Sequence, residues 1–176
     1  IVVCNGDEVA EIEFTTTSEN DIAYSWSIDT EIGKQSLTGV GNIPLFEAEN
    51  IGTDPVVATV TVTPSNDETD PSLTCEGSSI EFTITVNPTA QVDPVDSLDL
   101  CKGDTAVVDF TTSNGGVDSV TTYSWEITAG DSVFVGGALS DVGNINLPVI
   151  NETNADLVAT ITVTPTYTND GVDCTG

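Results

Sequence analysis

The side chains that could carry chemistry in this chain are carboxylates and cysteines. The chain has 176 residues, with 29 aspartates and glutamates, four cysteines, two lysines and no histidine. Without histidine, neither a Ser–His nor a Cys–His pair can form to activate a nucleophile. No glycine-rich phosphate loop is present, and no carboxylate lies in the apolar stretch that a general acid for glycoside hydrolysis needs. We therefore expect that the chain is not an enzyme.

Calcium binding is the chemistry that the carboxylates best suggest. The segment 87–104 concentrates four candidate ligands, Asp93, Asp96, Asp99 and Asp104. Ca²⁺ takes six to eight oxygen ligands, so such a cluster could fix the angle between two domains. The spacing matches no EF-hand loop, and the alternative is that these carboxylates are solvated and keep neighbouring molecules apart. The motifs require no other cofactor.

The charge of the chain excludes two classes of partner. The formal net charge is −27, which repels nucleic acid and anionic lipid, because phosphate binding depends on lysine and arginine. No apolar run approaches the roughly 18 residues that are needed to span a bilayer. We expect no nucleic-acid binding and no membrane insertion.

The elements that carry these residues occur twice. A shift of about a hundred residues lays the second half of the chain on the first. The matched blocks are CNGD and CKGD, EIEFTT and VVDFTT, YSW and YSW, VGNI and VGNI, and VATVTVTP and VATITVTP. Insertions fall between the blocks, as expected for surface loops. The repeat predicts two domains, 1–90 and 91–176.

Every matched block is predicted to be a β-strand. In SIEFTITVNP (79–88), apolar residues alternate with polar ones, which is the period of a half-buried strand. No stretch has helical periodicity, and Gly, Asn, Asp and Pro interrupt the pattern at short intervals. Roughly seven short strands in each hundred residues are typical of an immunoglobulin-like β-sandwich. We predict an all-β fold of two tandem sandwiches.

The only two tryptophans lie in the repeated Tyr-Ser-Trp phrase. Tyr24 and Trp26 share one face of a predicted strand, and Tyr123 and Trp125 share the equivalent face in the second copy. They could form a binding platform, but aromatic residues at strand spacing are far more often core residues. A sandwich commonly buries a tryptophan on its third strand. We predict that all four are core aromatics.

The four cysteines are expected to form disulfides. Each copy has one cysteine near its start and one near its end, and no C-x-x-C pair or histidine suggests a zinc site. The repeat predicts the pairs Cys4–Cys75 and Cys101–Cys174, whereas a Cys75–Cys101 bond would join the two copies. A closed loop of about 70 residues would stabilise each domain by roughly 4 kcal/mol. Paired disulfides indicate an oxidising, extracytoplasmic setting.

The ordered blocks resemble a known family. C-N-G-D, Y-S-W, G-N-I-P, A-T-[VI]-T-V-T-P, C-x-G and F-T-I-T-V-N-P together are similar to the PKD-like repeats of large secreted surface proteins of Bacteroidota, including gliding-type adhesins. The resemblance covers the first copy and nearly all of the second. The W-x-F-G-D-G turn of the better-known PKD domain is absent, so only the divergent PKD-like branch fits.

The resemblance implies an extracellular β-sandwich that is repeated many times, exported by the type IX route, and used as an adhesin, stalk or filament. Its partners would be neighbouring repeats of the same chain or identical filament subunits. The O-glycosylation pattern of Bacteroidota, Asp-[Ser/Thr]-apolar, occurs at Ser97, Thr105, Ser119 and Ser132. This pattern has low specificity.

The second copy ends before any counterpart of IEFTITVNP. A sandwich without its last strand exposes an edge, so we expect either that the strand follows in a longer chain or that a neighbouring subunit inserts it. The alternative function is recognition of a glycan or protein by loops at one end of a sandwich. The two copies differ most at 29–39 and 128–141, where any such specificity would lie.

Overall fold

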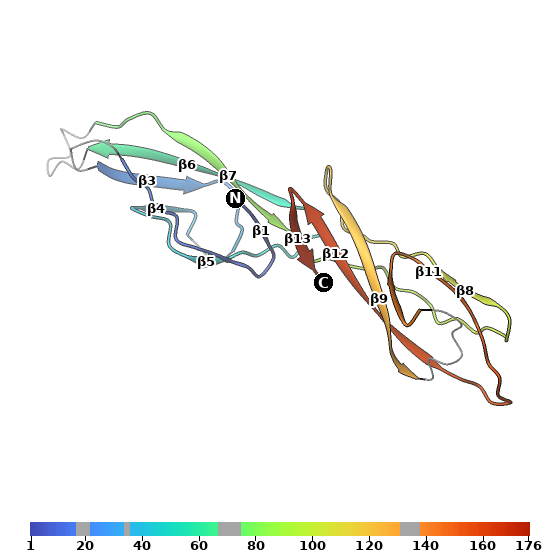
Figure 1. The fold of residues 1–176 in the computed structure, drawn as a ribbon. Helices are drawn as coiled ribbons and strands as arrows, with labels where there is room; N and C mark the ends of the chain where they lie inside the picture. The colour runs from blue at the N-terminus through green and yellow to red at the C-terminus, as the bar shows by residue number, and fades with distance from the viewer. Residues whose placement is uncertain (17–21, 34–35, 67–74, 131–137) are drawn as a thin grey trace. The chain divides into compact units, whose positions relative to one another are not determined.

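The chain divides into two compact units, Ile1–Pro88 and Thr89–Gly176. A computed structural model (Figure 1) describes residues 1–16, 22–33, 36–66, 75–130 and 138–176. Throughout these ranges the regular structure is β, and no helix occurs. The sequence had placed the boundary two residues later, after residue 90.

Unit 1 contains two sheets. Its strands are β1 (Val2–Cys4), β2 (Glu8–Val9), β3 (Ile22–Ile28), β4 (Thr38–Val40), β5 (Phe46–Glu47), β6 (Val56–Asn66) and β7 (Ile80–Asn87). Five strands form the larger sheet in the order β1-β7-β6-β3-β4, and β2 pairs with β5 in a smaller one. Side chains from both sheets meet in one buried cluster, which includes Val9, Trp26, Phe46, Val60 and Ile84.

The period-two pattern of the sequence explains the central strand of unit 1. On β6, Ala58, Val60 and Val62 are at most 1% exposed, and threonines alternate with them. β3 lies antiparallel on one side of β6, where Trp26 pairs with Val62, and β7 lies antiparallel on the other side, where Phe82 pairs with Val60. Both edges of β6 are thus hydrogen-bonded, and its apolar face is buried in the cluster that the smaller sheet also enters through Val9 and Phe46.

Unit 2 repeats this plan with fewer strands. Its strands are β8 (Thr105–Val108), β9 (Val120–Gly130), β10 (Ser140–Val142), β11 (Ile145–Pro148), β12 (Ala159–Asn169) and β13 (Val172–Thr175). The larger sheet has the order β10-β9-β12-β13, and β8 pairs with β11. The core cluster holds the buried residues Phe110, Trp125, Ile145 and Leu147.

Each unit has individual contacts that are equivalent to those of the other, as well as equivalent strands. The N–H of Gly41 donates to the carbonyl of Tyr24 at 2.8 Å, and the N–H of Gly143 donates to that of Tyr123 at the same distance. The ring centroids of Phe14 and Tyr24 are 5.6 Å apart at 45°, and those of Phe110 and Tyr123 are 5.5 Å apart at 46°. The repeat in the sequence is therefore a repeat in three dimensions.

Some matched blocks are turns, which corrects the prediction that all are strands. Gly6 and Gly103, in CNGD and CKGD, have φ of 86° and 92°, and Gly41 and Gly143, in the two VGNI blocks, have φ of 73° and 79°. Such values are easily reached only by glycine, which makes these positions turns. EIEFTT contributes only an isolated bridge from Ile12 to Ile43.

Unit 2 leaves open the edge that β7 covers in unit 1. β13 pairs with β12 only from Thr166 to Asn169, whereas β9 pairs with it from Ala159 to Thr168. Within the part of the chain that the structure describes, no strand pairs with the other edge of β12 at residues 159–163. Along residues 159–163, β12 is therefore paired on one edge, by β9.

Candidate functional site

The open edge of β12 is the most distinctive surface that the fold creates. In unit 1 the equivalent apolar residues of β6 are fully buried, but in unit 2 Ala159, Ile161 and Val163 are only half-buried. Leu100, the counterpart of the half-buried Val3 on β1, is 39% exposed, because β1 depends on β7 for its pairing. Partly exposed apolar side chains therefore lie along the unpaired part of β12.

The hydrogen bonds of β12 also define which of its residues direct their backbone groups to the open edge. The carbonyl of Thr164 accepts from Ser124 Oγ on the β9 side, as that of Thr63 accepts from Ser25 Oγ. The carbonyl of Pro165 faces the opposite edge, where it accepts from Gly176 N–H at 3.1 Å. Because successive residues of a strand point their backbone groups to opposite edges, Ile161 and Val163 direct their N–H and C=O groups to the open edge.

The chain continues into this edge in the same way in both units. Gly77 N–H donates to the carbonyl of Pro64 at 2.8 Å, immediately before β7 begins. Gly176 N–H makes the corresponding bond to Pro165. The two glycines thus make the same contact with the central strand of their unit.

The cysteines do not pair within units, so the predicted pairs Cys4–Cys75 and Cys101–Cys174 are wrong. Cys4 and Cys174 are disulfide-bonded, and Cys75 and Cys101 are exposed free thiols. In unit 1, Cys4 pairs with Asn87 at one end of the sheet, while Cys75 lies beside Asn66 at the other end. The eleven residues of β6 separate these ends by about 33 Å, whereas a disulfide requires Cα atoms within about 7 Å.

The same separation holds in unit 2. Cys174 pairs with Tyr167 towards the C-terminal end of β12. Cys101 belongs to a turn that contacts Val149 and Glu152, which precede β12: Gly103 N–H donates to the carbonyl of Val149 at 3.0 Å, and Lys102 pairs with Glu152 at 2.8 Å. Sequence order suggested the wrong pairs because it does not show which end of the sheet each cysteine reaches.

The four aspartates proposed for calcium are not brought together. Asp93 accepts from Thr111 Oγ1 at 2.7 Å, and Asp104 accepts from the backbone N–H of Cys101 at 2.8 Å. Asp96 and Asp99 lie exposed on a segment without regular structure. Among the described residues, no group of three or more acidic, cysteine or histidine side chains is placed to hold a metal ion. Asp104 closes a local turn, as Asp7 does beside Cys4 at 2.9 Å.

The predicted core aromatics lie where the pattern placed them. Trp26 and Trp125 are 6% and 4% exposed, while Tyr24 and Tyr123 are half-buried beside them. A Cβ at Gly39, which pairs with Trp26, would overlap the indole ring. Burial, and secondarily the charge of Asp93, raises the pKa of Tyr123. Both tryptophans are thus buried core residues.

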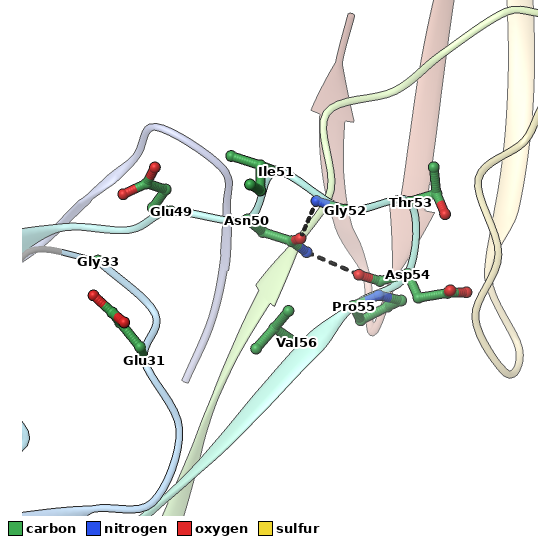
Figure 2. A pocket seen from close by; sticks show the side chains of 10 residues that line it. All are labelled: Glu31, Gly33, Glu49, Asn50, Ile51, Gly52, Thr53, Asp54, Pro55 and Val56. Atoms are coloured by element: carbon green, nitrogen blue, oxygen red, sulfur yellow. Dashed lines mark hydrogen bonds between the residues drawn. The ribbon is translucent and has the colours of Figure 1, made fainter.

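One open hollow lies at the end of unit 1 where β6 begins (Figure 2). It has a volume of about 660 Å³ and is lined by Glu31, Gly33 and residues 49–56. Asn50 is 4% exposed beneath it: its amide donates to the carbonyls of Val86 and Asp54 at 2.8 and 2.9 Å, and its oxygen accepts from Gly52 N–H at 2.9 Å. Sequence reasoning missed this residue, although the repeat of Asn50 as Asn151 was a signal.

Hydrogen bonds lower the pKa of one further carboxylate, that of Asp29. The backbone N–H of Thr59 donates to Asp29 Oδ1 at 2.7 Å and holds the pKa of Asp29 below its usual value. Asp29 thus caps the end of β3 against β6.

The proposed glycosylation residues have different environments. Ser97 and Thr105 are exposed, while Ser119 is half-buried and donates to the carbonyl of Gly116 at 3.0 Å. Ser132 lies outside the described residues. Ser97, Thr105 and Ser119 do not form a common site.

No helix that could cross a bilayer occurs in the residues that the structure describes. Comparison of the chain with protein-family models, with curated proteins and with solved structures found no match.

Proposed function

We propose that the chain is a pair of structural repeat modules from an extracellular adhesin, stalk or filament of a bacterial cell surface. Each module is an immunoglobulin-like sandwich of the PKD-like kind that the sequence resembles, exported by the type IX route. The modules act mechanically as spacers, without catalysis. Their partners are neighbouring repeats of the same chain or identical subunits.

The open edge of β12 is the observation that carries this proposal. In unit 1 the corresponding edge is covered by β7, whose Ile84 and Val86 are fully buried. An unpaired edge flanked by apolar residues promotes association with another strand. A repeat architecture provides that strand in the next segment or in the next subunit, since each repeat buries its surface against like structure.

The disulfide and the charge agree with this setting. Disulfides persist in oxidising compartments outside the cytoplasm, and Cys4 and Cys174 are disulfide-bonded. The net charge of −27 keeps such modules soluble and discourages lateral aggregation.

Strand complementation tests the proposal. A peptide with the sequence of residues 77–88, GSSIEFTITVNP, is added to the chain, and hydrogen–deuterium exchange is measured by mass spectrometry. We expect slower exchange at residues 159–163, with unit 1 unchanged because its β6 is already paired. A matched peptide in which the residues equivalent to Ile84 and Val86 are serine should not protect the edge, because it lacks the side chains that fill the core.

Equal protection by both peptides, or protection by neither, would contradict the filling of this edge by a module strand. Electron microscopy of the parent surface protein provides the second readout. Regular fibres or stalks are expected, and a compact particle without repeats would contradict the mechanical role.

A recognition function for a glycan or a protein is the alternative, and the hollow in unit 1 is the observation that favours it. Glu31 and Glu49 border it, and Ile51 beside them is 92% exposed. A glycan array with the wild-type chain and with Ile51→Asp tests this function. Binding to a defined glycan that the substitution abolishes would support recognition.

A further inference from the structure

The two free cysteines occupy equivalent places to the two bonded ones. Cys101 corresponds to Cys4 in the repeat, and Cys75 corresponds to Cys174. Cys4 and Cys101 each sit in a turn closed by an aspartate that accepts from the cysteine N–H, at 2.9 and 2.8 Å. One cysteine of each equivalent pair is disulfide-bonded and the other is an exposed thiol.

Each unit carries its cysteines at defined ends. We define the exit end of a unit as the end where its last strand would lead to the next unit. The opposite end is the entry end. Cys4 is at the exit end of unit 1, because it pairs with Asn87, one residue before the unit closes at Pro88. Cys174 is at the entry end of unit 2, because Gly176 packs against the backbone of Ala90, the second residue of that unit.

By the repeat, Cys75 is at the entry end of unit 1, and Cys101 is at the exit end of unit 2. The bonded cysteines are thus one from an exit end and one from an entry end, and so are the free ones. Since the two cysteines of a unit lie at opposite ends of a sheet about 33 Å long, neither free thiol can find its partner in its own unit.

We propose that Cys75 and Cys101 are intermodule crosslinking sites, in which the exit-end cysteine of one module bonds the entry-end cysteine of the module that follows it. In an array, Cys101 would bond the counterpart of Cys75 in the next module, and Cys75 would bond the counterpart of Cys101 in the preceding one. This inference rests on the proposed repeat array, and it adds a covalent connection that resists pulling along the array.

The chemistry requires an oxidant, which is a small-molecule disulfide or a thiol–disulfide oxidoreductase of the extracytoplasmic space. The thiolate of Cys101 attacks the oxidant's disulfide, forms a mixed disulfide and releases one thiol. The thiolate of Cys75 from the neighbouring module then attacks the sulfur of Cys101 and releases the second thiol. Two cysteine thiols are oxidised, and one disulfide of the oxidant is reduced to two thiols.

The test uses the two-unit chain with its existing disulfide intact, incubated with oxidised glutathione. Non-reducing electrophoresis should show a ladder of covalent multimers, and peptide mapping should identify Cys75 joined to Cys101. Cys75→Ser and Cys101→Ser should each abolish the ladder beyond the dimer. Both residues are exposed, so circular dichroism of the variants should match that of the wild type.

Mixing the two variants in equal amounts shows whether the ends recognise one another. Cys75→Ser retains only the exit-end thiol, and Cys101→Ser retains only the entry-end thiol. We expect the heterodimer to exceed the sum of the two homodimers by about tenfold, whereas random pairing gives equal amounts. Equal amounts, or monomers capped only by glutathione, would overturn the crosslink. Protection of residues 159–163 by the strand peptide would still support the array, so the two failures are distinguishable.

Discussion

At the scale of single residues, Asn50 shows how hydrogen bonds offset the desolvation of a buried polar side chain. Its amide bonds the carbonyl of Val86 on β7, and its own backbone N–H donates to Asn5 Oδ1 at 2.8 Å. Its counterpart Asn151 makes the local bonds to Thr153 and Ala155. Among the described residues, the Asn151 side chain bonds only within its own loop, whereas Asn50 reaches Val86 on a neighbouring strand.

The different hydrogen bonds of Asn50 and Asn151 predict different losses of stability when each is replaced by alanine. Asn50→Ala should lower the free energy of unfolding of unit 1 by about 2–3 kcal/mol, because it removes several hydrogen bonds of a side chain that is 4% exposed, among them those to the carbonyls of Val86 and Asp54. Asn151→Ala should lower that of unit 2 by about 1 kcal/mol or less, since only exposed bonds within the loop are lost.

Urea unfolding of two single-tryptophan backgrounds measures each unit separately. Trp125→Phe leaves Trp26 to report on unit 1, and Trp26→Phe leaves Trp125 to report on unit 2. Equal losses of stability for the two alanine variants, each in its own background, would show that the bond to Val86 does not distinguish the units.

Residue patterns in the sequence predicted the buried tryptophans but not the cysteine pairs. Burial of Trp26 and Trp125 follows from side-chain alternation within one strand, which is a local property. A disulfide depends on where two distant segments lie along the sheet. That position is set by the register of β6 with β7 and with the segment at Cys75, and no local pattern encodes it.

At the scale of elements, β6 and β12 are the same strand in two states of pairing. Both have eleven residues, and both lie against a tryptophan-bearing strand. β6 is paired along both edges through Val62, whereas β12 is paired along one edge at residues 159–163. The sequence predicted both strands, because the period-two pattern and the repeat are explicit.

The open edge predicts an alternating pattern of amide exchange in the free chain. The N–H groups of Ile161 and Val163 face the open edge, so they should exchange at least about a hundredfold faster than those of Val60 and Val62. The N–H of Thr162 faces β9 and should stay protected. Exchange is measured residue by residue by NMR. Similar protection of Val163 and Val62 would contradict the open edge.

The turns that connect the strands were less predictable. The repeated CNGD and VGNI blocks resemble strand ends, but four of their glycines have positive φ. Repetition shows that a block matters to the fold without showing whether it forms a strand or a turn. Short two-residue strands such as β2 and β5 were also beyond prediction, since they depend on pairing across the unit and not on a pattern of their own.

At the scale of the whole molecule, charge is the dominant property. The net charge is −27 in 176 residues, and 29 carboxylates share only two lysines as cationic side chains. Repulsion among them destabilises the compact state and is screened as salt is added. Because the four aspartates at 93–104 are not gathered into one site, cations should act on this chain through general screening.

Screening of the repulsion among carboxylates predicts how the stability of the chain depends on salt. The melting temperature should rise as NaCl increases from about 10 to 500 mM, because the Debye length falls from about 30 Å to below 10 Å over that range. Ca²⁺ and Mg²⁺ at equal ionic strength should raise it equally, and a chelator should leave it unchanged in a chain purified without added metal. Differential scanning calorimetry measures all three. As a control, Asp96→Asn and Asp99→Asn should leave the response to Ca²⁺ unaltered, since both side chains are exposed. A rise produced by micromolar Ca²⁺ but not by Mg²⁺, and lost in these variants, would instead establish a specific site that binds the native chain, because a ligand stabilises only the state to which it binds.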